Sequence, residues 1–324
     1  MKLFPRIVIG AAAASLLLAG SARAADKVRF MLASVPDLPS FALHRIADHL
    51  GYYKEAGIDI EFMPGKGGVD AATQLGAGNA DISSGIGDTS MIVRANGVTV
   101  KGIVLIGGGS LMVLATPVDS GLTSPKDLKG KAISVISYTD TTYYSLLGAL
   151  ASAGLSKNDV DIQALGPVGM TQAFIDGKVQ AIATVPDFIP TIENAGIKVN
   201  LYPASTYTPS MAQAVLTSDE MIAKKPDLVK RLAGVTKRVF VQFKNDPAGM
   251  AKVYVEAVPI HKAKQAEMTR IFSLYSKYAY QGQPTPGAFD SATVENMQDF
   301  YVKNSIIRRA SPVADLFDNR FVAQ

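Results

Sequence analysis

The 324-residue sequence contains no cysteine and no tryptophan. Without cysteine we expect no disulfide, no thiolate metal site and no cysteine nucleophile. A lipoprotein anchor also requires a cysteine at the leader cleavage point, so we expect no direct membrane anchor. The absence of tryptophan weakens the case for a sugar-binding surface, because indole rings are the largest stacking platforms that proteins have.

An excess of charge is also missing. The formal net charge is +4, and Lys2, Arg6 and Arg23 supply three of those charges within residues 1–24, which contain no acid. Without that segment the formal charge is +1 over 300 residues. This balance argues against nucleic acid as a partner, because binding to phosphate backbones depends on clustered positive charge. The length suits two domains.

The N-terminal segment has the pattern of an export signal. Lys2 and Arg6 precede an apolar run over residues 7–19, and Ala22-Arg23-Ala24 fits the small-x-small cleavage rule. We predict a signal peptide over 1–24, cleavage after Ala24, and a periplasmic location. The alternative is a membrane anchor, which we disfavour because the apolar run is short for a bilayer span.

The rest of the chain alternates strand and helix patterns, which is typical of an α/β fold with parallel sheets. Expected strands cover 28–32, 58–62, 80–84, 100–106, 131–136, 160–165, 181–184 and 199–201. Expected helices cover 41–50, 69–77, 90–95, 143–153, 170–176 and 189–194. Residues 219–324 are almost wholly helical in pattern, with amphipathic stretches at 226–244 and 264–278.

Two extended segments, 111–116 and 212–217, separate these units into two groups. We therefore predict two lobes, each a mostly parallel sheet flanked by helices, joined by two crossing strands. Lobe 1 comprises residues 25–112 and 215–324, and lobe 2 comprises 113–214. Ligand pockets favour such domain interfaces, and hinge closure around the ligand is the motion expected of this arrangement.

The stretch 119–135 is the most informative in the chain. Ser124 and Pro125 suit the start of a short helical turn that Gly130 ends, and an apolar strand follows from Ala132. The polar loop after that strand, 137–142, leads into a helix. A strand, a polar loop and a helix N-terminus together favour a site for a small anionic ligand.

Several segments also carry a family resemblance. Residues 51–60, GYYKEAGIDI, are similar to a family pattern G-Y-F-x-x-x-G-L-D-V, and 74–81 to A-L-x-x-G-x-x-D. Residues 124–135 match S-P-x-D-L-K-G-K-x-I-x-V, and 40–47, 153–160 and 173–181 resemble other family segments. In order and spacing they resemble the periplasmic solute-binding proteins of the sulfonate, nitrate and taurine transport group, which includes binders of thiamine-pyrimidine precursors. The resemblance implies the type II periplasmic binding protein fold and a role in an ABC importer, with a membrane permease as partner.

The sequence departs from the family in two places. The family often has a proline just after the first Ser/Pro-rich loop, where this chain has Phe41. Thiamine-pyrimidine synthases on this fold depend on a cysteine-rich motif and a histidine, and this chain has no cysteine. That enzymatic activity is therefore not carried over by the resemblance.

Candidate ligand-binding residues lie in the loops at the carboxyl ends of the expected strands. They combine hydroxyl groups, loop aspartates, one cation, flexible glycines and aromatic rings for an organic ligand. The predicted set is Asp37, Ser40, Phe41, Lys66, Gly67, Gly68, Asp88, Thr89, Ser110, Tyr138, Thr139, Thr141, Thr142, Asp187 and Phe188. The loop aspartates, with Asp140, leave a cationic, zwitterionic or hydroxyl-rich ligand open, and Asp140 is also suited to cap its own helix.

Catalytic and metal-binding patterns are weak. His44 and His49 are five residues apart and do not share a helical face, and His261 is remote. We predict a monomeric solute-binding protein without enzymatic activity, catalytic residues, metal or cofactor. An alkanesulfonate or taurine is the first ligand candidate, with carboxylates, nitrate and pyrimidine-like compounds open. The alternatives are an exported pyrimidine-precursor-processing enzyme on the same fold and a sensor that presents its ligand to a receptor kinase.

Overall fold

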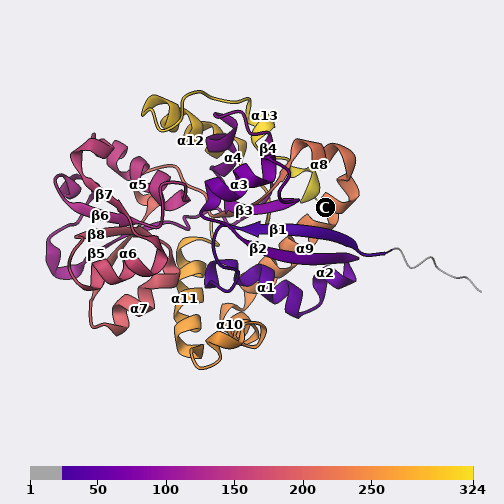
Figure 1. Cartoon of the computed structure of the whole chain (residues 1–324), viewed down its shortest axis with the longest axis horizontal. Helices are drawn as coiled ribbons and strands as arrows, with labels where there is room; N and C mark the ends of the chain where they lie inside the picture. The colour runs from indigo at the N-terminus through magenta and orange to yellow at the C-terminus, as the bar shows by residue number, and fades with distance from the viewer. Residues whose placement is uncertain (1–23, 324) are drawn as a thin grey trace, which may run out of the picture.

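The computed structural model describes residues 24–323. The predicted signal peptide lies, apart from Ala24, outside this range. Two five-stranded sheets form the centres of two bodies that lie side by side along the long axis of the molecule (Figure 1). We call the body around the first sheet the first lobe and the body around the second sheet the second lobe. The predicted two-lobed α/β fold is confirmed.

The first sheet has the strand order β2-β1-β3-β10-β4. β10 runs antiparallel to both of its neighbours, whereas β1 pairs in parallel with β2 and β3. The strands are β1 (Asp26–Leu32), β2 (Ile58–Pro64), β3 (Ile82–Ile86), β4 (Val100–Ile106) and β10 (Gln213–Ser218).

The second sheet repeats this plan in the order β7-β6-β8-β5-β9, with β5 antiparallel to both neighbours. In each sheet the antiparallel strand is therefore the one that the chain enters on arriving from the other lobe. The strands are β5 (Val113–Pro117), β6 (Ala132–Val135), β7 (Asp161–Ala164), β8 (Ala181–Thr184) and β9 (Val199–Pro203).

Helices cover both faces of each sheet, as parallel β–α–β units require. Those that connect strands are α1 (Ala42–His49), α2 (Tyr52–Glu55), α3 (Gly68–Gly76), α4 (Thr89–Arg94), α5 (Thr141–Ser152), α6 (Gly166–Ile175) and α7 (Ile189–Asn194). The 3₁₀ turns η1 (Pro39–Phe41), η3 (Pro125–Leu128) and η5 (Pro186–Phe188) precede α1, β6 and α7. A capping box between Ser124 and Asp127 begins η3, where a short helical turn is predicted.

The C-terminal third is helical, as predicted. It comprises α8 (Asp219–Lys224), α9 (Pro226–Asn245), α10 (Pro247–Ala257), α11 (Gln265–Tyr278), α12 (Ser291–Lys303) and α13 (Val313–Leu316). α9 buries one face against the first lobe through Leu232, Val239 and Phe240. α11 lies at the junction of the two lobes (Figure 1), and its Leu274 belongs to the core of the second lobe.

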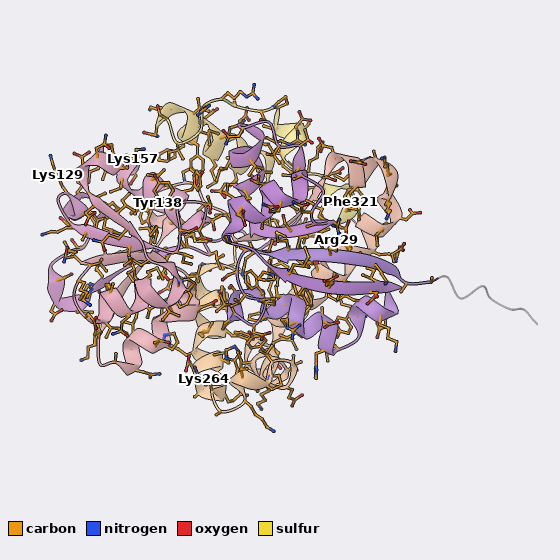
Figure 2. All side chains as sticks on the ribbon, viewed as in Figure 1. Arg29, Lys129, Tyr138, Lys157, Lys264 and Phe321 are labelled. Carbon is orange, nitrogen blue, oxygen red and sulfur yellow. The ribbon has the colours of Figure 1, made fainter. Side chains whose placement is uncertain are left out.

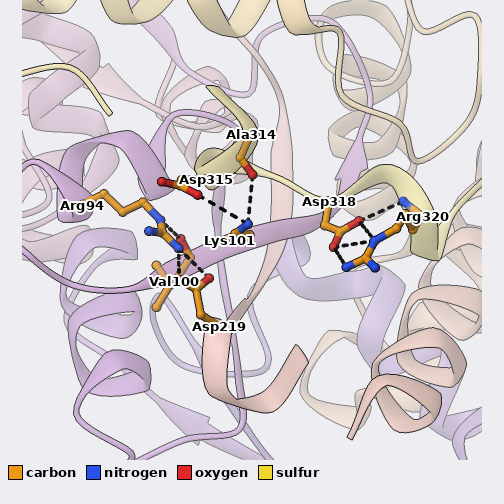
Figure 3. Close-up of polar contacts among 8 residues, drawn as sticks. All are labelled: Arg94, Val100, Lys101, Asp219, Ala314, Asp315, Asp318 and Arg320. Atoms are coloured by element: carbon orange, nitrogen blue, oxygen red, sulfur yellow. Dashed lines mark hydrogen bonds and ion pairs between the residues drawn. The ribbon is translucent and has the colours of Figure 1, made fainter. Parts of the chain in front are cut away.

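Polar contacts fasten this C-terminal segment to the edge of the first sheet. Lys101 Nζ donates to the carbonyl of Ala314 at 2.9 Å and lies 3.8 Å from Asp315 (Figure 3). The neighbouring pair Arg94–Asp219 joins α4 to the start of α8 (Figure 3). Within residues 24–323, no helix combines the length and the apolar character needed to cross a bilayer.

The two crossing segments run side by side. The N–H of Ala204 donates to the carbonyl of Met112 at 3.0 Å, and the N–H of Ala212 donates to Gly107 at 3.4 Å. Gly107 has φ +102, and a Cβ there would lie 2.2 Å from the carbonyl oxygen of Ala279, so glycine is required. Because β5 and β10 lie in different sheets, the chain passes from the first lobe to the second and back again. The exact lobe boundaries, 25–112 with 215–324 and 113–214, stay a prediction.

Candidate ligand-binding site

A cavity lies between the lobes at the carboxyl ends of their parallel strands. The first lobe contributes residues from the loop after β1, from β3, α1 and β10, and from the end of β4 and the crossing segment that follows it; the second contributes Ile136, Asp140, Thr141, Val185 and Phe188. The space open to the centres of water molecules is about 50 Å³, enough for a few waters at ~10–15 Å³ each. An organic ligand of ordinary size therefore needs more room than the cavity has in this structure.

The walls of the cavity are mainly apolar. The aliphatic and aromatic lining residues are Ala33, Leu38, Phe41, Leu43, Ile86, Ile106, Leu111, Met112, Ile136, Val185, Phe188 and Ala214. The polar ones are Ser34, Ser40, His44, Ser84, Asp140, Thr141 and Gln213. An apolar cavity with a few convergent polar groups is the usual form of a site for a small organic molecule.

Asp140 is the N-cap of α5 and is buried. Its carboxylate accepts from the N–H of Thr142 at 2.9 Å and from the Thr142 hydroxyl at 2.6 Å. Burial raises the pKa of Asp140, while bonds from Thr142, Gly68 and Thr141 act in the opposite direction. The helix begins two residues before the predicted start at Tyr143, because this carboxylate satisfies the first free N–H groups.

The loop before α3 packs directly against the loop before α5. A Cβ at Gly67 would lie 2.5 Å from the carbonyl oxygen of Thr139, and one at Gly68 would lie 2.8 Å from a methyl of Thr141. The hydroxyls of Ser137 and Thr139 both donate to the Lys66 carbonyl at 3.1 Å. These contacts join the two lobes at one side of the cavity.

A second junction is built around Asp187. Its carboxylate accepts from the N–H of Ser40 at 3.0 Å and from the Tyr275 hydroxyl at 2.5 Å. Burial raises the pKa of Asp187, and the bonds from Tyr275 and Ser40 oppose that shift. The Ser40 carbonyl in turn accepts from Nε2 of Gln213 at 2.9 Å, so a short chain of bonds runs from the second lobe into β10.

His44 lines the cavity from α1. Its ring is 4.5 Å from that of Phe30, and its Nδ1 lies 3.4 Å from the hydroxyl of Tyr53. Burial lowers the pKa of His44 to about 3, so the imidazole is neutral at physiological pH. It can act as a hydrogen-bonding or stacking group there, but it cannot supply positive charge.

The structure brings only part of the predicted set to the cavity. Ser40, Phe41, Thr141 and Phe188 line it. Lys66, Gly67, Gly68, Thr139, Thr142 and Asp187 lie in or beside the contacts between the lobes. The Gly67 N–H, expected to be available to an anion, donates instead to the Ala33 carbonyl at 2.7 Å, and the Lys66 side chain is exposed.

The remaining predicted residues have other partners and do not line the cavity. Asp88 is fully buried and accepts from Tyr301, and Asp37 lies 3.5 Å from Arg45. Thr89 caps the loop after β3 by accepting from the Ile86 N–H, and Ser110 donates to the Met112 carbonyl. Tyr138 is exposed on the second lobe (Figure 2) and donates to the carbonyl of Ile162.

Most lining residues were not in the predicted set, among them the polar residues Gln213 and His44. Gln213 begins β10 and His44 lies inside α1, whereas the prediction considered only loops. The one available signal was the position of Gln213, a polar residue in the apolar run Ala212–Leu216. No group of three or more histidine, aspartate or glutamate side chains in the described chain is arranged to hold a metal ion.

Comparisons with known proteins find relatives of similar sequence and solved structures of the same fold. The riboflavin-binding protein RibY of Chloroflexus aurantiacus is 23% identical over 305 residues, covering 92% of this chain and 86% of its own. The structure of the alkanesulfonate-binding protein SsuA of Xanthomonas axonopodis pv. citri, bound to MOPS, superposes with TM-score 0.70 at 17% identity, covering 90% of this chain and 98% of that chain.

The same fold also occurs in an enzyme. The desulfurization enzyme DSZB superposes with TM-score 0.56 at 13% identity, covering 92% of this chain and 97% of that chain. The fold alone therefore does not separate binding from catalysis. The family described as NMT1/THI5 like matches residues 39–250, well over half of the sequence, and the chain belongs to that family.

Proposed function

We propose that this protein is the solute-binding component of an ABC importer. It captures a small organic molecule between its lobes and delivers it to a membrane permease from the periplasm. The observation that carries the proposal is the apolar cavity at the carboxyl ends of the strands, to which both lobes contribute side chains. Ligand contacts on both lobes favour the closed form over the open form, which is how binding becomes a signal that a permease can recognise.

Two further observations support capture by closure. Over residues 24–323 the chain crosses between the lobes in two segments, which are hydrogen-bonded to each other. The space between the lobes is too small for an organic solute without a change of angle. Opening and closing about the crossing segments is the motion that admits the solute and then encloses it.

A thermal-shift screen of the mature protein tests this proposal. The protein is unfolded and refolded once to remove carried-over solute, and the panel holds sulfonates, taurine, nitrate, carboxylates, pyrimidines and flavins. A ligand at 100 times its dissociation constant stabilises the folded state by about 2.7 kcal/mol. We expect at least one compound to stabilise the protein. In solution scattering, the protein with that compound should have a smaller radius of gyration than the protein without it. A protein that binds none of them, as purified or refolded, contradicts a solute-binding role.

The enzymatic alternative remains testable because DSZB shares the fold. Any compound that stabilises the protein is incubated with it and followed by mass spectrometry. A binding component returns the compound unchanged, whereas turnover at catalytic ratios of protein to compound would assign an enzyme.

A further inference from the structure

We infer that the cavity selects an uncharged organic solute that donates an N–H or O–H hydrogen bond to Oε1 of Gln213. This inference rests on the proposed function, since it names the class of solute that the same cavity takes. It departs from the sulfonate or carboxylate expected from the sequence. Three features of the cavity support it: the charge of the lining, the hydrogen-bond donors already in use, and one unpaired acceptor.

The cavity offers no positive charge to an anion. Among its lining residues in the described chain, none is lysine or arginine, and the one histidine is neutral at physiological pH. The Lys66 side chain is exposed and does not line the cavity. Lys129 and Lys157 lie on the outer rim of the second lobe, away from the junction (Figure 2). A buried anion without a paired cation is strongly disfavoured.

The backbone donors that suit an anion are occupied. At the start of α5, the Thr142 N–H and hydroxyl both donate to the Asp140 carboxylate. The Gly67 N–H donates to the Ala33 carbonyl, and the Ser40 N–H donates to Asp187. The helix N-terminus thus already holds an anion of the protein's own, and a sulfonate placed there would meet a carboxylate instead of free donors.

Asp140 is equally unsuited to attract a cationic solute. Its carboxylate already interacts with the N–H groups of Thr141, Thr142 and Gly68 and with the Thr142 hydroxyl. These four donors come from both lobes and use most of the lone pairs of a carboxylate. The charge is therefore matched within the protein, and an uncharged solute is the class that the lining favours.

Gln213 supplies the acceptor that identifies the solute. Its side chain is 7% exposed, and Nε2 donates to the Ser40 carbonyl at 2.9 Å. Because a carbonyl only accepts, this bond fixes the orientation of the amide and points Oε1 away from Ser40. Oε1 is buried and has no hydrogen-bond partner within the described chain. The phenol of Tyr280 is hydrogen-bonded to the same side chain, which lowers the pKa of Tyr280 against the larger raising effect of burial. A bond that lowers the pKa of a phenol comes from a donor, so it involves Nε2 and leaves Oε1 unpaired.

A buried acceptor without a donor is uncommon in folded proteins and costs free energy until a partner arrives. A solute with an N–H or O–H at this point removes that cost when it binds. A solute of the same shape without the donor leaves Oε1 unpaired in the closed form. We therefore expect the presence of the donor to raise affinity about tenfold.

Two matched sets of compounds test the charge of the solute. Butyramide, butyrate and propane-1-sulfonate share a propyl group, and benzamide, benzoate and benzenesulfonate share a phenyl ring; butylammonium and benzylammonium complete the sets. Binding is measured by calorimetry and thermal shift. The expected result is that an amide binds at least tenfold more tightly than its matched anions and cation. Preferential binding of an anion or of a cation overturns the inference but leaves the proposed function standing, whereas failure of all classes, including the wider panel above, contradicts the proposed function itself.

A second experiment tests Gln213 directly. N-methylbenzamide and methyl benzoate differ only by an N–H in place of an ester oxygen. The wild-type protein should prefer the amide about tenfold, and Gln213→Met should lose that preference while still binding the ester. Equal loss of affinity for both compounds would show that Gln213 acts only in packing, and an unchanged preference would remove Oε1 from the site. Tyr280→Phe is the matched control, because it removes the neighbouring phenol and should retain the preference for the amide.

Discussion

The two lobes use their buried loop carboxylates in different ways. In the second lobe, Asp140 and Asp187 accept hydrogen bonds from backbone N–H groups of the first lobe, at Gly68 and Ser40. In the first lobe, Asp88 is bonded to Tyr301 of the same lobe. The two sheets share one strand order, so the difference does not follow from topology. It indicates that the second lobe carries the carboxylates that hold the lobes together, although the Ser137 and Thr139 hydroxyls of that lobe also donate across the junction, to the Lys66 carbonyl.

This division explains why loop aspartates are poor guides to the charge of the solute. A carboxylate in a cleft can bind a cation, cap a helix or bridge two lobes, and all three uses place it at the end of a strand. Asp140 caps α5 and bridges the lobes at once. The solute is then left with the apolar walls and the few polar atoms that the protein has not used.

The largest effect is expected at Gly67, where the lobes meet most closely. Gly67→Ala adds a Cβ at 2.5 Å from the Thr139 carbonyl oxygen, at a backbone with φ +127. We expect affinity for the bound solute to fall about 100-fold, or ~2.7 kcal/mol, because the closed form is strained. Calorimetry on the two proteins measures the change.

Gly78→Ala is the control for Gly67. Its φ is +81, yet no atom lies within 4 Å of the added Cβ. It also places a side chain at a positive φ, but away from the junction and without a clash. The protein should therefore be less stable but bind within about twofold of wild type, a free-energy change too small to reflect a lost contact. If both variants bind equally well, the Gly67 contact is not part of the liganded form.

The fold was largely predictable from sequence because the signals were local. The predicted strand 100–106 and the predicted helix 189–194 coincide with β4 and α7. The repeated strand and helix patterns were sufficient to place two sheets and two crossings. The start of α5 was predicted two residues late, because which side chain caps a helix depends on how Asp140 is oriented.

The site was less predictable because its contacts are remote in sequence. Tyr301 reaches Asp88 across 213 residues, and Gln213 reaches Ser40 across 173. No local pattern indicates that Asp88 is covered or that Gln213 faces the cavity. Loop position at the end of a strand identified the right region, and tertiary packing then decided which side chains line it.

Asp88 provides the next test, through stability and pH. Burial raises the pKa of Asp88 to about 7. Between the ordinary pKa of an aspartate and about 7, the unfolded chain ionises this group while the folded chain keeps it protonated, so stability falls as pH rises through that range and then levels off. In Asp88→Asn the free energy of unfolding should therefore decrease by ~2 kcal/mol less than in the wild type over this range. Urea unfolding between about pH 4.5 and pH 8 measures the difference.

Tyr301→Phe tests the same pKa, with the opposite expected effect on the pH dependence of stability. The Tyr301 hydroxyl lies 2.6 Å from Asp88 and lowers the pKa of that carboxyl. Without it the pKa should rise further and the loss of stability should extend to higher pH. Parallel stability curves for wild type, Asp88→Asn and Tyr301→Phe would show that Asp88 does not titrate in this range.

Asp187→Asn should weaken solute binding more than Asp88→Asn, because the Asp187 carboxylate is bonded across the junction of the lobes. Asp187→Asn places an amide against two donors, the Ser40 N–H and the Tyr275 hydroxyl, so one of them loses its acceptor. We expect affinity for the solute to fall about tenfold, ~1.4 kcal/mol. Asp290→Asn, an exposed cap of α12 in the first lobe, is the matched control and should bind as wild type. A larger loss for Asp88→Asn than for Asp187→Asn would contradict the division of roles between the lobes.

The smallest effect is expected for the ion pair between Arg270 of α11 and Glu193 of α7. The two charges lie 2.8 Å apart across the junction, but their side chains are 46% and 33% exposed. Solvent screening limits such pairs to roughly 0.5 kcal/mol. A double-mutant cycle with Arg270→Gln and Glu193→Gln should therefore give a coupling of about that size in solute affinity, decreasing with salt. A coupling as large as the effect of Asp187→Asn would mean that surface charge, rather than the buried carboxylates, holds the lobes together.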